Sequence, residues 1–341
     1  MAEGIPSLWI EIYLNVENGV IDYMKKSIIT LWLRSRSLVA HFTRNFSRDN
    51  LMIASKFHKY HGLGNDYLVL DPQCKQPMYT TSQIIRICDR NLGIGSDGIL
   101  YGPLPSKKAD FALEIWNIDG TEAEKSGNGL RIFARFLFDS GKVVSDKIFT
   151  VETKGGIVSC IVKENGQLIT VDMGKITFHS KEIPVNLNGE AREVLGEVME
   201  IDKEQIHYYS ASIGNPHVVV PVETLCKDRI CSLGPKIENY VQLFPNRTNV
   251  QFMKVVDRSN IEILIWERGV GYTLASGSSS CATAAVARKM GACDENITVH
   301  VPGGQIQINV SPTYEITMTA SVTKIGCFHL DQEAFEFSMP Q

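Results

Sequence analysis

Apolar and polar residues alternate over many short stretches after residue 55, and such alternation predicts half-buried β-strands. Residues 57–71 resemble two strands joined by a turn, with Gly62, Gly64 and Asn65 at the turn. Further strands are expected at residues 111–117, 150–152, 157–163, 261–267 and 306–310. Residues 82–91 predict a short helix with Ser82 as its N-cap. The pattern therefore indicates a mainly β protein with few helices.

Two segments break this alternation because they are apolar nearly all round. They are residues 130–138 and 277–287, and no charged residue lies between 272 and 287. A helix that is apolar on every side is typical of a buried helix. Each segment follows a strand and a loop that ends in a serine and a glycine, at Ser126 and Ser276. Gly291 is a suitable stop for the second helix.

The chain repeats itself at an offset of 150 residues without a gap. The matched features are Gly64-Asn65 with Gly214-Asn215, Trp116 with Trp266, and Ser126-Gly127 with Ser276-Gly277. A duplicated unit of this length predicts two similar lobes, each mostly β around one buried helix. We expect the two serines to face each other across a cleft between the lobes.

Composition narrows the function classes. The 341 residues are 44% hydrophobic and 21% charged, which is typical of a globular protein large enough for two domains. A formal charge of −4 favours neither nucleic acid nor a membrane surface as a partner. The eight cysteines form no CxxC pair, so we expect no metal site, no disulfide framework and a cytoplasmic location. Residues 93–98 match G-x-G-x-x-G, but a helix precedes and a strand follows, which is the wrong order for a dinucleotide loop.

The first fifty residues differ from the rest. Residues 25–48 carry six basic side chains and no acid, as an amphipathic transit peptide or a surface helix would. Four acids lie upstream, which argues against a transit peptide: Glu3, Glu11, Glu17 and Asp22. We interpret residues 1–51 as an extension outside the fold.

The two helix starts predict an anion site. A helix start leaves backbone N–H groups unpaired, and these bind a carboxylate. Gly127, Asn128, Gly277 and Ser278 are the expected donors. Two acid–base groups on opposite faces of one carbon permit stereoinversion by proton transfer. The alternative is that each serine is simply an N-cap.

The chain resembles the diaminopimelate epimerase family over residues from about 55 to 330. The motifs that carry the resemblance are residues 61–66 (HGLGND), 93–98 (GIGSDG), 117–122 (NIDGTE), 126–129 (SGNG), 214–217 (GNPH), 247–249 (RTN), 267–271 (ERGVG), 275–278 (ASGS) and 302–304 (PGG).

This resemblance implies an α+β fold of two pseudo-symmetric lobes, each a curled, mostly antiparallel β structure around a central helix. It implies a first lobe of residues 55–175 plus 328–341 and a second of 176–327. It also implies amino-acid epimerisation without a cofactor, in lysine and cell-wall biosynthesis.

The catalytic positions that the resemblance implies are Ser126 and Ser276, where the family has cysteines. Tyr272 and Ser279 depart from the family as well. His217 and Glu267 lie beside the two catalytic positions, either as general bases or as residues that orient their neighbours. The binding positions for the far ammonium and carboxylate are Asn65, Asn117, Asn215, Asn249, Glu267 and Arg268.

The expected function is conversion of LL- to meso-diaminopimelate by two-base proton transfer at the α-carbon. The expected partner is a small amino acid with a second polar end, and a homodimer is left open. Three alternatives remain. The first is a protein that binds an amino acid without turnover, and the second is a lyase-type relative that removes a proton from one side. The third is an enzyme in which both serines are engineered replacements.

Overall fold

The computed structural model describes residues 55–72, 79–331 and 333–336. The expected extension at residues 1–51 lies outside the described residues. Within the described part, no helix is long and apolar enough to cross a membrane.

The order of elements shows the duplication directly. The first half contains β1 (Ser55–Gly62), β2 (Asn65–Leu70), α2 (Thr81–Cys88), β3 (Gly98–Leu104), β4 (Phe111–Asn117), β5 (Glu122–Ala123), α3 (Gly127–Asp139), β6 (Ile148–Thr153), β7 (Gly156–Lys163) and β8 (Leu168–Lys175). The second contains β10 (Glu204–Ser212), β11 (Pro216–Pro221), α4 (Lys227–Glu238), β12 (Asn249–Asp257), β13 (Asn260–Glu267), β14 (Gly271–Thr273), α5 (Gly277–Lys289), β15 (Asn296–Val301), β16 (Gly304–Val310) and β17 (Glu315–Ser321). β9 (Glu197–Ile201) precedes this set, and β18 (Thr323–Leu330) and α6 (Glu333–Glu336) follow it.

Strand pairing repeats as well. Most pairs are antiparallel, but β2 pairs with β3 and β4 with β6 in parallel. The equivalent pairs of the second half, β11 with β12 and β13 with β15, are also parallel. The turns before β2 and β11 both place a glycine at positive φ, Gly64 at 95° and Gly214 at 102°. Glycine adopts this conformation without the steric penalty of a Cβ, so both turns require it.

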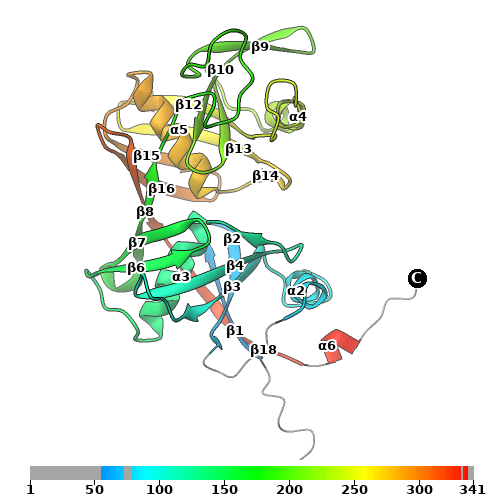
Figure 1. Ribbon diagram of the computed structural model, residues 1–341, viewed down its shortest axis with the longest axis vertical. Coiled ribbons are helices and arrows are strands. Elements are labelled where there is room, and N and C mark those ends of the chain that lie inside the picture. The colour runs from blue at the N-terminus through cyan, green and yellow to red at the C-terminus, as the bar shows by residue number, and fades with distance from the viewer. Residues whose placement is uncertain (1–54, 73–78, 332, 337–341) are drawn as a thin grey trace, which may run out of the picture. The chain divides into compact units, whose positions relative to one another are not determined.

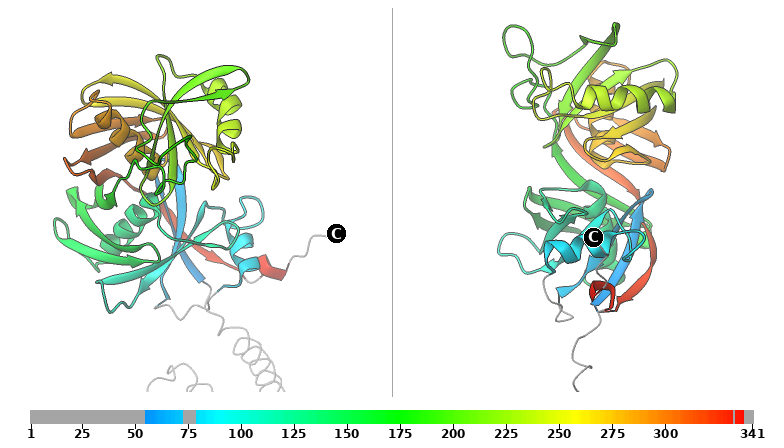
Figure 2. Two further views of the ribbon diagram at one scale, coloured as in Figure 1. Left: turned by 45° about the horizontal axis from the view of Figure 1, so that its top comes forward. Right: turned by 90° about the vertical axis from the view of Figure 1, so that its right-hand side faces the viewer.

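Two lobes result, and strands connect them (Figure 1). β8, green, pairs antiparallel with β17, which ends the second set of elements. β18, at the red end of the colour range, then returns to the first lobe and pairs with β1. Figure 2 shows these connecting strands from two further directions. The pairing of β18 with β1 runs from Thr323 to Leu330.

Each sheet is covered by helices. The apolar residues of α3 and α5 belong to one continuous buried cluster, together with inward-facing residues of both lobes. α2 packs Ile84 and Ile87 against the other face of the first sheet, beside Leu68 and Ile99. α4 packs in the same way in the second lobe, with Ile230 and Ile237 beside Val250. The two central helices are therefore buried, as the absence of a polar face predicts.

The start of α2 corrects one prediction. Ser82 was expected as its N-cap, but the cap is Thr80. The Thr80 side chain accepts from the backbone N–H of Gln83, and the Gln83 side chain accepts from the N–H of Thr80. This reciprocal capping box satisfies two backbone donors, which a cap at Ser82 would not.

Candidate functional site at the starts of α3 and α5

The two predicted serines cap the two central helices. Ser126 precedes α3 with φ −137° and ψ 117°, and Ser276 precedes α5 with φ −143° and ψ 126°. The Ser126 hydroxyl accepts from the backbone N–H of Gly129 at 3.0 Å. The Ser276 side chain makes no capping bond, and its hydroxyl has no hydrogen-bond partner within the described part of the chain. The backbones are thus alike, but Ser126 is a bonded cap and Ser276 is not.

Met318 of β17 brings the two helix starts together. A Cβ placed on Gly127 would lie 2.9 Å from Met318 Cε, and one on Gly277 would lie 3.0 Å from Met318 Sδ. The Gly277 position is also 3.4 Å from Asn128 Oδ1, across the boundary between the lobes. No side chain larger than hydrogen fits at either glycine without moving Met318. The first turns of both helices, with their unpaired N–H groups, therefore meet in one region.

A directed chain of hydrogen bonds fixes the amides of the first lobe. Arg131 Nη2 donates to Asn128 Oδ1 at 2.5 Å, and Asn128 Nδ2 donates to Asn65 Oδ1 at 3.0 Å. Asn65 Nδ2 then donates to Asp97 Oδ2 at 2.7 Å. Arg131 is fully buried, and burial lowers its pKa to about 10. This buried cation sets the orientation of the predicted binding residues Asn128 and Asn65.

A second chain fixes the equivalent residues of the second lobe. Gln251 Nε2 lies 3.2 Å from His217 Nδ1, and His217 Nε2 lies 3.0 Å from Asn215 Oδ1. Asn215 Nδ2 donates to Ser278 Oγ at 3.4 Å. Because the Gln251 amide donates, His217 carries its proton on Nε2 and donates to Asn215. Burial and, to a lesser extent, the charge of nearby Arg268 lower the pKa of His217 to about 3, so the ring is neutral at pH 7. Both ring nitrogens are occupied, which favours the orienting role of His217.

Asn249 and Asn117 stabilise the loops around the site. Asn249 Nδ2 donates to Pro216 O at 2.9 Å, and Asn249 Oδ1 accepts from the backbone N–H of Arg268 at 2.9 Å. The Arg268 side chain donates from Nη1 to Asn246 O at 2.9 Å. Asn117 Nδ2 donates to Thr121 Oγ1 at 3.0 Å. These bonds join the ends of β11, β12 and β13 and hold the loop after β4.

Glu267 brings a carboxyl group of the second lobe close to charges of the first. Burial and, to a lesser extent, the negative charge of Asp97 raise its pKa to about 7. The charge of Glu267 in turn raises the pKa of Tyr67. Asp97 belongs to the first-lobe hydrogen-bond chain, so the charge of Glu267 acts on residues of the first lobe.

Three residues of this site were not predicted. Tyr67 Oη lies 3.3 Å from Ser126 Oγ, Arg131 orients Asn128, and Gln251 holds His217. Tyr67 had been interpreted as an ordinary strand residue. The repeat offset contained a signal, because Tyr67 lies 150 residues before His217.

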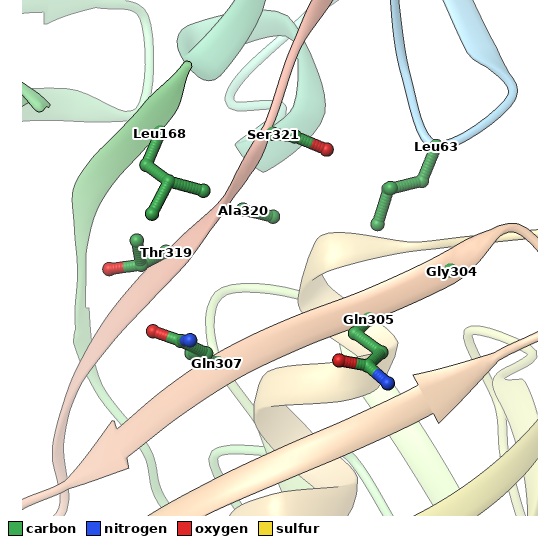
Figure 3. Close-up of a pocket in the computed structure, with 8 residues that line it drawn as sticks. All are labelled: Leu63, Leu168, Gly304, Gln305, Gln307, Thr319, Ala320 and Ser321. Carbon is green, nitrogen blue, oxygen red and sulfur yellow. The ribbon is translucent and has the colours of Figure 1, made fainter. Parts of the chain in front are cut away.

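A groove of about 490 Å³ lies elsewhere, along β8, β16 and β17 (Figure 3). Leu63, Leu168, Gln305, Gln307 and Thr319 line it, with Gly304, Ala320 and Ser321. It includes none of the predicted site residues. The backbone oxygen of Ser321 accepts from Arg131 Nη1 at 3.1 Å. Within the described ranges, no cluster of three or more His, Cys, Asp or Glu side chains is arranged to hold a metal ion.

Sequence comparison identifies the family. The diaminopimelate epimerase family model matches residues 57–179 and 209–325. The chain is 54% identical over 280 residues to diaminopimelate epimerase 2 of Nostoc sp., covering 82% of this chain and 97% of that one. The chain belongs to the diaminopimelate epimerase family. It is also 39% identical over 272 residues to the diaminopimelate epimerase of Stutzerimonas stutzeri, covering 79% of this chain and 96% of that one.

Solved structures support the α+β, two-lobed fold of this family member. A hydroxyproline epimerase from Agrobacterium vitis is 14% identical with a TM-score of 0.61, covering 84% of this chain and 95% of that one. A phenazine biosynthesis protein of the PhzF family from Bacillus anthracis is 17% identical with a TM-score of 0.59, covering 81% of this chain and 98% of that one. At these identities the likeness shows the fold alone.

Proposed function

We propose that this chain is an isomerase that inverts one α-carbon of diaminopimelate, converting the LL form to the meso form by two-base proton transfer. The observation that carries the proposal is the meeting of the two serine-capped helix starts around Met318. Membership of the diaminopimelate epimerase family supports the substrate class. The reaction belongs to lysine and cell-wall biosynthesis.

The helix starts supply the carboxylate site. At α5, the backbone N–H groups of Gly277, Ser278 and Ser279 precede the first intrahelical bond, which Ser280 N makes to Ser276 O. At α3, the N–H of Gly129 is taken by Ser126, which leaves those of Gly127 and Asn128. Such N–H groups together with the helix dipole bind a carboxylate. A carboxylate held there has its α-carbon between Ser126 and Ser276.

The far end of the substrate needs groups of opposite charge. In the proposed complex, the Glu267 carboxylate pairs with the distant ammonium, and Arg268 pairs with the distant carboxylate. The Arg268 side chain has one donor committed to Asn246 O and keeps other guanidinium donors for a ligand. Asn65 and Asn215 present oriented amides, because the two hydrogen-bond chains fix which end of each amide donates. Asn117 and Asn249 complete the site by holding its loops.

Proton transfer is the demanding step because alcohols are weak acids. An alkoxide is not accessible near neutral pH unless a neighbouring base or hydrogen-bond donors stabilise it. On the Ser126 side, the backbone N–H of Gly129 is a hydrogen-bond donor to the oxygen that would carry the charge, and the Glu267 carboxylate is left to pair with the distant ammonium. On the Ser276 side, His217 is neutral and fully hydrogen-bonded, so it orients Asn215 and takes no proton.

The proposed reaction uses side chains alone, in the cytoplasm, on a small amino acid with a second polar end. A homodimer is part of the proposal, and sedimentation of the purified protein tests it. Neither nucleic acid nor a membrane enters the proposed role.

Incubation with LL-diaminopimelate in D₂O tests the function. The expected product is meso-diaminopimelate with deuterium at the inverted α-carbon, detected by mass spectrometry after chiral separation. Tight binding without exchange would instead indicate a binding protein. Exchange without inversion, or loss of a leaving group, would indicate the lyase-type reaction.

A further inference from the structure

We infer that Tyr67 is a positioning residue for Ser126, because its phenol donates a hydrogen bond to Ser126 Oγ and stabilises that oxygen when it is deprotonated. The inference rests on the proposed function in assigning Ser126 a proton-transfer role. Serine is a weaker acid than cysteine, and the Tyr67 hydrogen bond would offset part of this difference by stabilising the deprotonated oxygen.

Either hydroxyl of this pair could donate, and the inference assigns the donor role to Tyr67. Tyr67 Oη lies 3.3 Å from Ser126 Oγ and has no other hydrogen-bond partner among the described residues. Ser126 Oγ already accepts from the N–H of Gly129 at 3.0 Å. With the Tyr67 hydroxyl also donating, two donors converge on this oxygen, and the Ser126 proton is free to point at a substrate. Donors that converge on a developing anion lower its free energy most in a buried site.

Packing fixes the phenol at this position. Tyr67 is 8% exposed and lies in β2, between β1 and β3. A Cβ on Gly98 of β3 would lie 2.7 Å from Tyr67 Cε1, so the ring occupies space that glycine leaves open. The ring therefore cannot swing toward β3 to leave Ser126.

The charges around Tyr67 keep it a donor. Burial, together with the carboxylates of Glu267, Asp97 and Asp66, raises its pKa to about 12 despite the opposing effect of Ser126. The phenol is therefore neutral at pH 7 and retains its proton. Tyr67 supports Ser126 and does not replace it as the base.

The repeat shows that this support is confined to one lobe. The residue 150 positions after Tyr67 is His217, and the residue 150 positions after Ser126 is Ser276. His217 directs both ring nitrogens to Gln251 and Asn215, and neither reaches Ser276. The equivalent residues of the two lobes thus have different contacts. Tyr67 contacts Ser126 in the first lobe, and His217 contacts the Asn215 amide in the second.

The proton balance of the supported step is simple. The Ser126 alkoxide takes the α-proton, and the C–H electron pair stays on the α-carbon, in conjugation with the substrate carboxylate. The Ser276 hydroxyl delivers its proton to the opposite face and becomes the alkoxide. Tyr67 keeps its own proton throughout, and its hydrogen bond makes the Ser126 alkoxide less costly.

A thiol placed at the supported position reports the effect without requiring turnover. We would make Ser126→Cys alone, with Tyr67→Phe, and with Tyr60→Phe, and measure the pH dependence of iodoacetamide alkylation at residue 126 by peptide mass spectrometry. A hydrogen bond to an ionised group lowers a pKa by about 1. We therefore expect Tyr67→Phe to raise the pKa of the new thiol by about 1, with no change from Tyr60→Phe.

Tyr60→Phe is the matched control. Tyr60 is the cross-strand partner of Tyr67, is fully buried, and donates its hydroxyl hydrogen bond to Asp139 Oδ2 at 2.9 Å. Both variants remove one buried phenol oxygen from the same strand pair, and Tyr67 alone contacts Ser126. An equal thiol pKa in all three proteins, or an equal rise from both Phe variants, would overturn the inference.

Turnover of the serine form separates this inference from the proposed function. With Tyr67→Phe in the otherwise unchanged chain, we expect kcat for α-proton exchange to fall about 10-fold with KM nearly unchanged. If the unchanged chain exchanges no α-proton, the proposed function fails, and the thiol pKa still decides the role of Tyr67. If exchange occurs and Tyr67→Phe leaves its rate and pH profile unaltered, the inference fails and the proposed function stands.

Discussion

The starts of α3 and α5 have nearly the same backbone but different surroundings. Ser126 accepts from Gly129 N–H and contacts Tyr67, whereas the Ser276 hydroxyl has no partner in the described structure. Arg131 in α3 is fully buried, and the equivalent residue of α5 is Cys281, which is also fully buried. The two helix starts share their backbone geometry, while the side chains around each serine differ. Because an inversion removes the proton from one face of the α-carbon and delivers a proton to the opposite face, the two acid–base groups need not be alike.

Replacing both serines with cysteine should have the largest effect. A thiol at a helix start has a lowered pKa, so Ser126→Cys with Ser276→Cys should raise the rate of epimerisation by about 10²-fold or more. Either single change should do far less, since inversion needs one group for each face. The measurement is inversion of LL-diaminopimelate by chiral chromatography. A double variant that binds the substrate but exchanges no α-proton would show that the pocket itself has diverged.

Glu267→Gln should change how ligand binding depends on pH. Because burial raises the pKa of Glu267 to about 7, the unliganded carboxyl is only partly ionised at neutral pH. Binding of a ligand ammonium should therefore strengthen as pH rises through 7, and Glu267→Gln should remove this dependence and weaken binding about 10-fold. Calorimetric titration from pH 5.5 to 8.5 measures both. A pH dependence that survives the substitution would assign it to another group.

The same group should affect folding stability. The pKa of Glu267 in the folded chain, about 7, lies above its unfolded value of about 4.3. Its contribution to the free energy of unfolding is therefore fully present below about pH 4.3 and is lost as pH rises toward 7. The contribution of His217 has the opposite sign, because its folded pKa of about 3 lies below the usual value: it is present above about 6.5 and is lost as pH falls. Urea unfolding of Glu267→Gln and the unchanged chain between pH 4 and 8 should show a difference that grows with pH. A constant difference would contradict the raised pKa.

Alanine at the two caps should give unequal stability losses. Ser126→Ala removes the bond from Gly129 N–H and should cost about 1 kcal/mol. Ser276→Ala removes no capping bond and should change the free energy of unfolding by less than about 0.5 kcal/mol. Denaturant unfolding followed by circular dichroism compares them. Equal losses would mean that the two caps are equivalent in solution.

The tautomer of His217 is the subtlest test. Nitrogen-15 correlated NMR should show the proton on Nε2, with no titration of the ring between pH 5 and 8. A ring that titrates near 6.5 would return His217 to the list of candidate bases and would make the second lobe resemble the first.

Much of this arrangement could be predicted from the sequence, because it depends on local patterns. The helix starts at Gly127 and Gly277, the strands at residues 111–117 and 261–267, and the stop at Gly291 follow from periodicity and glycine placement. α2 began earlier than predicted because Thr80 and Gln83 form a capping box that outcompetes Ser82. The contact between the His217 ring and the Gln251 amide could not be predicted, since it depends on the pairing of β11 with β12.

Tyr67 and Arg131 show the limit for single residues. In an apolar strand, Tyr67 has the character of a core residue, and its contact with Ser126 exists only once β2 lies beside α3. Arg131 interrupts an apolar helix, which indicates a surface position, yet the side chain is fully buried and donates to an amide and a backbone carbonyl. A charge with such partners cannot be recognised without the fold.

The central claim is that each serine serves one face of the same carbon, and α-proton exchange by the two single alanine variants tests it most directly. Each variant retains one base, so it should exchange the α-proton of one epimer with D₂O without inverting it. Ser126→Ala and Ser276→Ala should therefore exchange opposite epimers, LL in one case and the D-centre of meso-diaminopimelate in the other, as followed by proton NMR. Exchange of the same epimer by both variants, or full inversion by either one, would contradict the account.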